Sequence, residues 1–111
     1  MKAITDVIAV SDLAATAKPI VIKFEAKWCQ PCKAMTPTLQ AIEKDFGDRV
    51  EFYAANVEQC PLMAQFFGIS QIPALASLVG GTVTGTRKGA GSKQEIVQWM
   101  TQSIASLRDE R

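Results

Sequence analysis

The sequence predicts an α/β protein with one mixed sheet and helices on both faces. Three observations carry this prediction. Strand-like and helix-like segments alternate along the chain, residues 20–26 are apolar on both sides except at Lys23 and Glu25, and Gly80-Gly81 joins the last two strands. Alternating segments need crossover connections and parallel pairing, whereas a two-residue hairpin needs antiparallel pairing. We expect a central mixed five-stranded sheet flanked by four helices, in a single domain over residues 1–111.

In the first quarter of the chain, the residue pattern predicts two strands and a short helix. Residues 3–9 can form a strand, and Ser11 is a typical N-cap for a helix over residues 12–17. The run over residues 20–26 is rich in branched side chains, which is typical of a central strand covered on both faces.

A long amphipathic helix is predicted over residues 30–46. Apolar side chains recur at steps of three and four, and Gly47 is the expected stop. Pro37 lies inside this helix and is expected to kink it, because proline cannot donate to the preceding turn. The apolar stripe consists of Cys32, Met35, Leu39, Ile42 and Phe46.

In the second half of the chain, the residue pattern predicts three strands and two helices. We expect a strand over residues 50–56, a short helix over residues 61–67, and a hairpin of strands 74–79 and 82–88. The last helix begins at a capping box formed by Ser92 and Glu95. Its inward residues are predicted to be Ile96, Met100, Ile104 and Leu107.

Composition excludes several classes of function. The chain carries 12 Lys plus Arg against 11 Asp plus Glu, so no charge excess favours nucleic acid or an anionic membrane. No apolar run is long enough to span a bilayer, and the N-terminal residues do not resemble a secretory signal. Three cysteines, an odd number, argue against a disulfide-stapled secreted scaffold, so we expect reduced thiols and a cytoplasmic monomer. Without histidine, Ser-His and Cys-His catalysis are excluded.

The segment Trp28-Cys29-Gln30-Pro31-Cys32 places a dithiol where a strand meets a helix. A helix N-terminus presents unpaired N–H groups and about half a positive charge, which favours a thiolate. Cys29 is therefore predicted to ionise easily and to act as a reachable nucleophile. Pro31 suits the first turn, and Cys32, one turn on, can close and reopen a disulfide.

Cys60, the third cysteine, precedes Pro61 at another helix start. It is either a reactive thiol favoured by the helix dipole or an inert core residue, and the inert reading is favoured. A zinc site would need two more nitrogen or sulfur ligands beside Cys29 and Cys32, so no metal is expected.

Together these features resemble the thioredoxin family. A Cys-x-x-Cys motif by itself is weak evidence for this family. The evidence is specific here because a strand precedes Trp-Cys-x-Pro-Cys-Lys, a helix follows it, and Ile-Pro stands 40 residues later. The matching segments are Phe24-x-Ala26-x-Trp28-Cys29-x-Pro31-Cys32-Lys33, Pro37, Phe67-Gly68-Ile69, Ile72-Pro73, Gly80-Gly81 and Gly89-Ala90. The resemblance implies a thioredoxin-like fold over most of the chain.

The resemblance also implies residue roles. Cys29 is the attacking sulfur and Cys32 the resolving sulfur, and the Ile72–Pro73 bond is cis, with Pro73 packed against the dithiol. The backbone of Ile72 is then available to pair with a substrate strand. The residues expected around the substrate are Trp28, Gln30, Pro31, Ile72, Pro73, Gly89 and Ala90.

The chain departs from the family pattern at three positions. Gln30 stands where glycine is typical, Lys23 where a buried acid assists the resolving cysteine, and Ala54 where a lysine partners that acid. Our hypothesis is that Lys23 pairs with Glu25, two residues on along the same face, and that its ammonium favours a thiolate of the dithiol. Glu25, or Lys23 without its proton, could replace the missing base. The alternative is that Lys23 reaches solvent at a strand edge.

The predicted function is a thiol–disulfide oxidoreductase that reduces protein disulfides through Cys29 and Cys32. It would need no bound cofactor beyond its redox-active disulfide, and the resemblance implies a thioredoxin reductase as partner. Two alternatives stay open: an oxidant or isomerase of the same fold, and a non-catalytic binding subunit.

Overall fold

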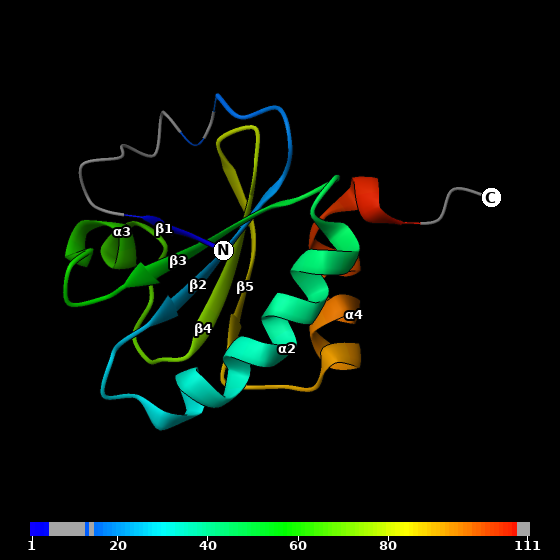
Figure 1. Ribbon diagram of the computed structural model, residues 1–111. Coiled ribbons are helices and arrows are strands. Elements are labelled where there is room, and N and C mark those ends of the chain that lie inside the picture. Colours follow the sequence, from blue (N-terminus) through cyan, green and yellow to red (C-terminus); the bar gives the residue numbers. More distant parts are fainter. Residues whose placement is uncertain (5–12, 14, 109–111) are drawn as a thin grey trace.

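The computed structural model describes residues 1–4, 13 and 15–108 of the chain (Figure 1). Within these residues the elements are β1 (Lys2–Ile4), β2 (Ile20–Glu25), α2 (Gln30–Phe46), β3 (Glu51–Asn56), α3 (Pro61–Phe66), β4 (Ala74–Val79), β5 (Thr82–Lys88), α4 (Lys93–Ser103) and the 3-10 helix η1 (Ala105–Leu107).

The described strands form one five-stranded mixed sheet in the order β1-β3-β2-β4-β5. Strands β1 and β2 both run parallel to β3, whereas β4 pairs antiparallel with β2 and with β5. This arrangement confirms the predicted α/β class and places β2, which leads into the dithiol, in the middle of the sheet.

Four flanking helices were predicted, and the described residues contain three α-helices and one short 3-10 helix. Residues 5–9 of the first predicted strand, and residues 12 and 14 of the helix predicted over residues 12–17, lie outside the described residues, and residues 15–17 are not helical. The last helix ends earlier than predicted. Ile104 takes an extended conformation after Ser103, so the buried Ile104 and Leu107 belong to the cap and to η1.

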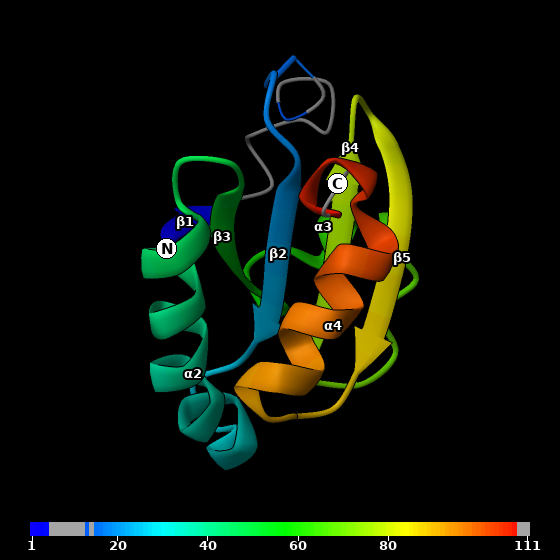
Figure 2. The same ribbon diagram turned by 90° about the vertical axis from the view of Figure 1, so that its right-hand side faces the viewer.

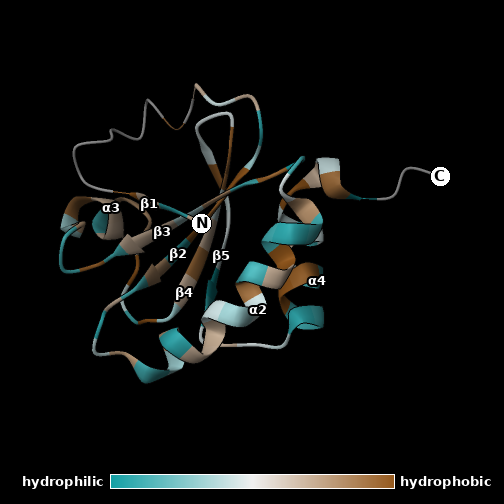
Figure 3. Cartoon of the chain, in the orientation of Figure 1, coloured by the Kyte–Doolittle hydropathy of each residue, from teal (hydrophilic) through white to brown (hydrophobic). Residues whose placement is uncertain are grey.

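The helices cover both faces of the sheet. Figures 1 and 2 show α2 and α4 side by side on one face and α3 on the other. Figure 3 shows hydrophilic and hydrophobic stretches alternating along α2 and α4, as expected for helices that bury one side. Among the helices of the described residues, none has both the length and the apolar character needed to cross a bilayer.

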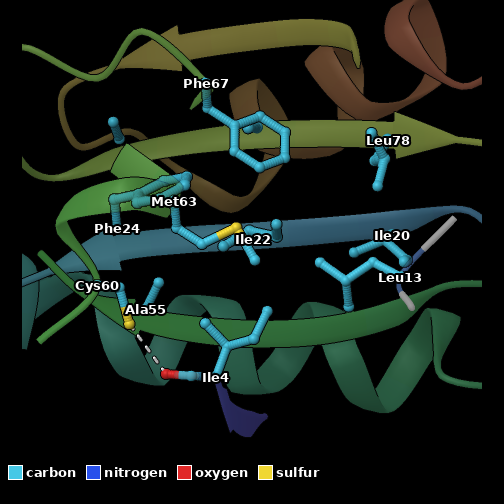
Figure 4. Close-up of a cluster of buried hydrophobic side chains, with 12 residues drawn as sticks. Ile4, Leu13, Ile20, Ile22, Phe24, Ala55, Cys60, Met63, Phe67 and Leu78 are labelled. Carbon is cyan, nitrogen blue, oxygen red and sulfur yellow. Dashed lines mark hydrogen bonds between the residues drawn. The ribbon is translucent and has the colours of Figure 1, made fainter. Parts of the chain in front are cut away.

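The face under α3 is an apolar core (Figure 4). Alternate residues of β2 point to it, and the Phe24 and Phe67 rings lie 5.6 Å apart between their centroids. The Cys60 thiol donates a hydrogen bond to the Ile4 carbonyl across 3.1 Å. The buried members are Ile4, Leu13, Ile20, Ile22, Phe24, Ala55, Cys60, Met63, Phe67, Ala74, Ala76 and Leu78.

The face under α2 and α4 carries the second core and the buried charge. The predicted stripe of α2 packs here through Met35, Leu39 and Ile42 against Val21 of β2. Because side chains alternate along a strand, Lys23 and Glu25 lie on the same face as Val21. The helix that starts at the dithiol therefore packs on the side of the sheet that holds Lys23.

Local signals fix the ends of several elements. Gly80 and Gly81 both have positive φ, 56° and 86°, as a two-residue hairpin turn requires. Ser92 Oγ accepts the Glu95 N–H while the Glu95 carboxylate accepts the Ser92 N–H, which confirms the predicted capping box. Helix α2 continues through Pro37 to Phe46.

Candidate active site

Cys29 is the N-cap of α2. Its backbone is extended, with φ −89° and ψ 104°, and its sulfur accepts the Cys32 N–H at 3.3 Å. A sulfur in this position takes the place that an oxygen takes in an ordinary cap, where it satisfies one of the unpaired N–H groups of the first turn. The sequence signal for this geometry is a strand that is followed, after three residues, by cysteine, one residue and proline.

Cys32 closes a disulfide with Cys29. Their Cα atoms are 5.3 Å apart, within the range that a disulfide bridges without backbone movement. Cys29 is 4% exposed and Cys32 1%. Both pack with Ala26 in a small cluster that Val57 and Ile72 border. The dithiol is thus less accessible in this structure than the sequence suggests.

Trp28 and Ile72 lie together in a shallow pocket beside this cluster. The pocket has a volume of about 380 Å³, and Trp28 is 64% exposed. The indole N–H of Trp28 donates to Glu58 across 3.0 Å, which holds the ring at the pocket edge. The lining residues are Trp28, Val57, Ala64, Ile69, Ser70, Gln71 and Ile72.

The other residues expected to contact substrate lie on α2 and after β5. Gln30 and Pro31 are exposed on the first turn of α2, and Gly89 and Ala90 follow β5. The Ile72–Pro73 bond is cis, as the resemblance implies, and the Gly89 N–H donates to the Pro73 carbonyl at 2.8 Å. This bond ties the loop after β5 to the start of β4.

Some pocket residues were missed from the sequence. Ser70 and Gln71 line the pocket directly before Ile72, so their place next to Ile72-Pro73 was an available signal. Glu58, in the loop after β3, accepts the hydrogen bond from the Trp28 indole, and no local sequence pattern predicts this contact.

Lys23 lies behind the dithiol. Its side chain is 1% exposed, and its ammonium donates to the Cys32 carbonyl at 2.7 Å and to Thr36 Oγ1 at 2.8 Å. Glu25 Oε1 lies 2.7 Å from the same nitrogen. The alternative that Lys23 reaches solvent at a strand edge is wrong, because β2 is paired on both sides and Lys23 is buried.

Strand β3 has an uncharged residue at the position beside Lys23. Lys23 is paired in register with Ala54 of β3, so a methyl group stands directly beside it. A pocket of about 360 Å³ opens at this place, between β3 and the first turn of α2. Its lining residues are Ala3, Ile4, Glu25, Ala26, Lys27, Cys32, Lys33, Thr36, Ala54, Asn56 and Gln59.

The chemistry of the site is that of two sulfurs. Over the part of the chain that the structure describes, no group of three or more histidine, cysteine or acidic side chains could hold a metal ion. A cysteine at a helix N-cap with a second sulfur within bonding reach can exchange disulfides without any other group.

Comparison with known proteins agrees with this geometry. The thioredoxin family model matches residues 5–102. A thioredoxin of Streptomyces clavuligerus is 34% identical over 98 residues, covering 88% of this chain and 91% of its own. A thioredoxin of Rickettsia typhi is 27% identical over 101 residues, covering 91% and 96%, and one of Acidithiobacillus ferridurans is 29% identical over 94 residues, covering 85% and 87%. With its Cys29–Cys32 pair, the chain is a thiol–disulfide oxidoreductase that belongs to the thioredoxin family.

Proposed function

We propose that the protein reduces disulfide bonds of other proteins and is recharged by a thioredoxin reductase. The observation that carries the proposal is the Cys29–Cys32 pair at the start of α2, next to an apolar pocket with an exposed tryptophan. Apolar surface beside a reactive sulfur lets a protein partner dock while its disulfide is attacked.

The reaction begins when the Cys29 thiolate attacks one sulfur of the substrate disulfide. A Cys29–substrate disulfide forms, and the other substrate sulfur leaves as a thiolate and takes a proton. Cys32 then attacks Cys29, so the second substrate sulfur leaves and the Cys29–Cys32 disulfide closes. Two electrons pass from the protein to the substrate, and no bound cofactor is needed because the two sulfurs carry them.

The substrate chain would lie along the segment before the cis-proline. Trp28 and Ile72 provide apolar contact, and the backbone of Ile72 pairs with the extended substrate strand. Gln30, Pro31, Gly89 and Ala90 would contact substrate side chains. We place the protein as a monomer in a reducing compartment such as the cytoplasm, where the recharged dithiol is stable.

An insulin disulfide reduction assay tests the proposal. With dithiothreitol as reductant, the protein should accelerate insulin precipitation, and a Cys29→Ser/Cys32→Ser variant should not. A thioredoxin reductase with its electron source should then replace dithiothreitol. If the wild-type protein gives no acceleration with either reductant, protein-disulfide reduction is not its function.

A second candidate, a disulfide-donating oxidant, is favoured by one observation. The Lys23 ammonium behind Cys32 stabilises a negative charge, and hence the reduced form of the dithiol. Equilibration with reduced and oxidised glutathione separates the two: a reductase stays largely oxidised under conditions in which a strong oxidant is reduced. A binding subunit without catalysis would keep partner binding in the double serine variant.

A further inference from the structure

The Lys23 ammonium is fully occupied by acceptors. Its three N–H bonds match three oxygens: the Cys32 carbonyl, Thr36 Oγ1 and Glu25 Oε1 at 2.7, 2.8 and 2.7 Å. A neutral amine has two N–H bonds and could satisfy two of them. The three acceptors around Lys23 therefore match an ammonium as donor.

We propose that Lys23 is a positioning residue that stabilises the thiolate of Cys32 and so speeds the step in which Cys32 resolves the mixed disulfide. The inference rests on the order of attack proposed above. In this role the Lys23 ammonium promotes the ionisation of Cys32, so that no neighbouring base is needed to remove the proton.

Of the two charged groups, the ammonium is the one with a hydrogen bond to Cys32. Lys23 Nζ donates to the backbone carbonyl of Cys32, whereas Glu25 contacts Lys23 with a side chain that is 32% exposed. Water screens the exposed carboxylate more than the buried ammonium. The pair thus leaves a net positive field at Cys32.

Other charges near Cys32 are few among the described residues. Lys27 and Lys33 line the same pocket but are exposed, so solvent screens them. β3 contributes the uncharged Ala54 and Asn56 to that pocket. Besides the positive end of α2, the field at Cys32 is therefore set mainly by Lys23 and Glu25.

The Cys32 thiol gives its proton to solvent through the pocket that Cys32 lines, and the resulting thiolate attacks Cys29. The Cys29–Cys32 bond forms, the bond between Cys29 and the substrate sulfur breaks, and the departing thiolate takes up a proton. Cys32 and Cys29 end as the oxidised pair, and the substrate sulfur is reduced.

Two variants with opposite effects test this role. Reduced protein is mixed with one equivalent of an aromatic disulfide whose thiolate absorbs light. The first release reports attack by Cys29, and the second reports resolution by Cys32. We expect Lys23→Gln and Lys23→Met to slow the second phase about tenfold at pH 7 and to move its pH midpoint up by about one unit.

Glu25→Gln is the matched variant, because it removes the negative charge and leaves the ammonium. We expect its second phase to be as fast as the wild type or faster, with a lower pH midpoint. Lys23→Gln keeps a hydrogen-bond donor without the charge, so it separates charge from positioning by hydrogen bonds. Circular dichroism and the first phase of each trace show whether a variant is folded.

Three results would overturn the proposal. The first is a second phase in folded Lys23→Gln that matches the wild type. The second is Lys23→Met slowing resolution while Lys23→Gln does not. The third is Glu25→Gln slowing it as much as the lysine variants, which would make Glu25 the base. Because the assay uses a small disulfide, it is independent of whether the protein reduces protein substrates.

Discussion

Helices α2 and α3 begin in nearly the same way and end in different chemistry. Cys29 caps α2 with Pro31 in the first turn, and Cys60 caps α3 with Pro61 directly after it. Both thiols follow a strand and precede a helix. The sequence signal that predicts a reactive Cys29 is therefore also present, in part, at Cys60.

The two sulfurs differ in where they point. The Cys29 sulfur accepts an N–H from its own helix and has Cys32 as a bonding partner. The Cys60 backbone has φ −127° and ψ 56°, its side chain makes no cap bond, and its sulfur donates to the Ile4 carbonyl inside the apolar core. Cys60 is fully buried. A helix N-terminus activates a thiol when the side chain turns back onto the helix and a partner can reach it.

Helix length adds to the difference. α2 has 17 residues and α3 has six, so the first turn of α2 is backed by a longer row of aligned peptide dipoles. Both the direction of the side chain and the helix behind it therefore favour Cys29 as the reactive sulfur.

The largest expected effect is the loss of activity on removal of Cys29. Cys29→Ser should lower insulin disulfide reduction roughly a thousandfold or more, because no other sulfur can start the exchange. Cys60→Ser is the matched control and should retain near wild-type turnover. A Cys60→Ser variant as inactive as Cys29→Ser, with its fold intact, would place Cys60 in the reaction and end the contrast between the two helix starts.

Alkylation rates should show the next largest difference. In the reduced protein at neutral pH, iodoacetamide should modify Cys29 at least about a hundredfold faster than Cys60, because the Cys29 sulfur caps α2, which favours its thiolate, whereas the Cys60 sulfur points into the apolar core. Peptide mass spectrometry of quenched samples gives both rates. In denaturant the two rates should converge, and a gap that persists there would mean that the fold is not its cause.

Local patterns predicted most of the fold and of the site. Branched residues over 20–26, the stripe from Cys32 to Phe46 and the Gly80-Gly81 turn each specify one element with little help from the rest of the chain. The pair of Cys29 and Cys32 could be identified because both sulfurs lie within one helical turn.

Long-range contacts could not be predicted in the same way. The bond between Trp28 and Glu58 joins residues 30 apart, and the burial of Lys23 depends on β2 being paired on both sides. The sequence suggested a Lys23–Glu25 pair but left open whether Lys23 reaches solvent. Only the packed sheet and α2 together, with Thr36 and the Cys32 carbonyl as acceptors, decide that point.

Cys60 should matter for stability where Cys29 matters for activity. Cys60→Ala removes a buried sulfur and its hydrogen bond to Ile4, so we expect the free energy of unfolding to fall by about 1–2 kcal/mol. Urea unfolding of the reduced protein measures this change. The rate of disulfide reduction per folded molecule should stay constant, and a parallel loss of rate would contradict a purely structural role.

The start of α4 is a third case, capped by oxygen and without redox chemistry, and it gives the smallest effect. Hydrogen bonding to the Ser92 backbone N–H, and to a smaller extent to the Ser92 side chain, lowers the pKa of Glu95 from its ordinary value of 4.5. A carboxylate whose pKa is lowered by folding stabilises the folded state at pH values above the ordinary pKa. This stabilisation is lost as the pH falls through the pKa of the folded state.

The wild-type protein should therefore lose more stability between about pH 5 and pH 3 than Glu95→Gln, which has no proton to take up. Thermal unfolding at each pH measures both. Because Glu95 is exposed, the gap should be small, and identical pH profiles for the two proteins would show that this cap holds its helix through geometry alone, without its charge.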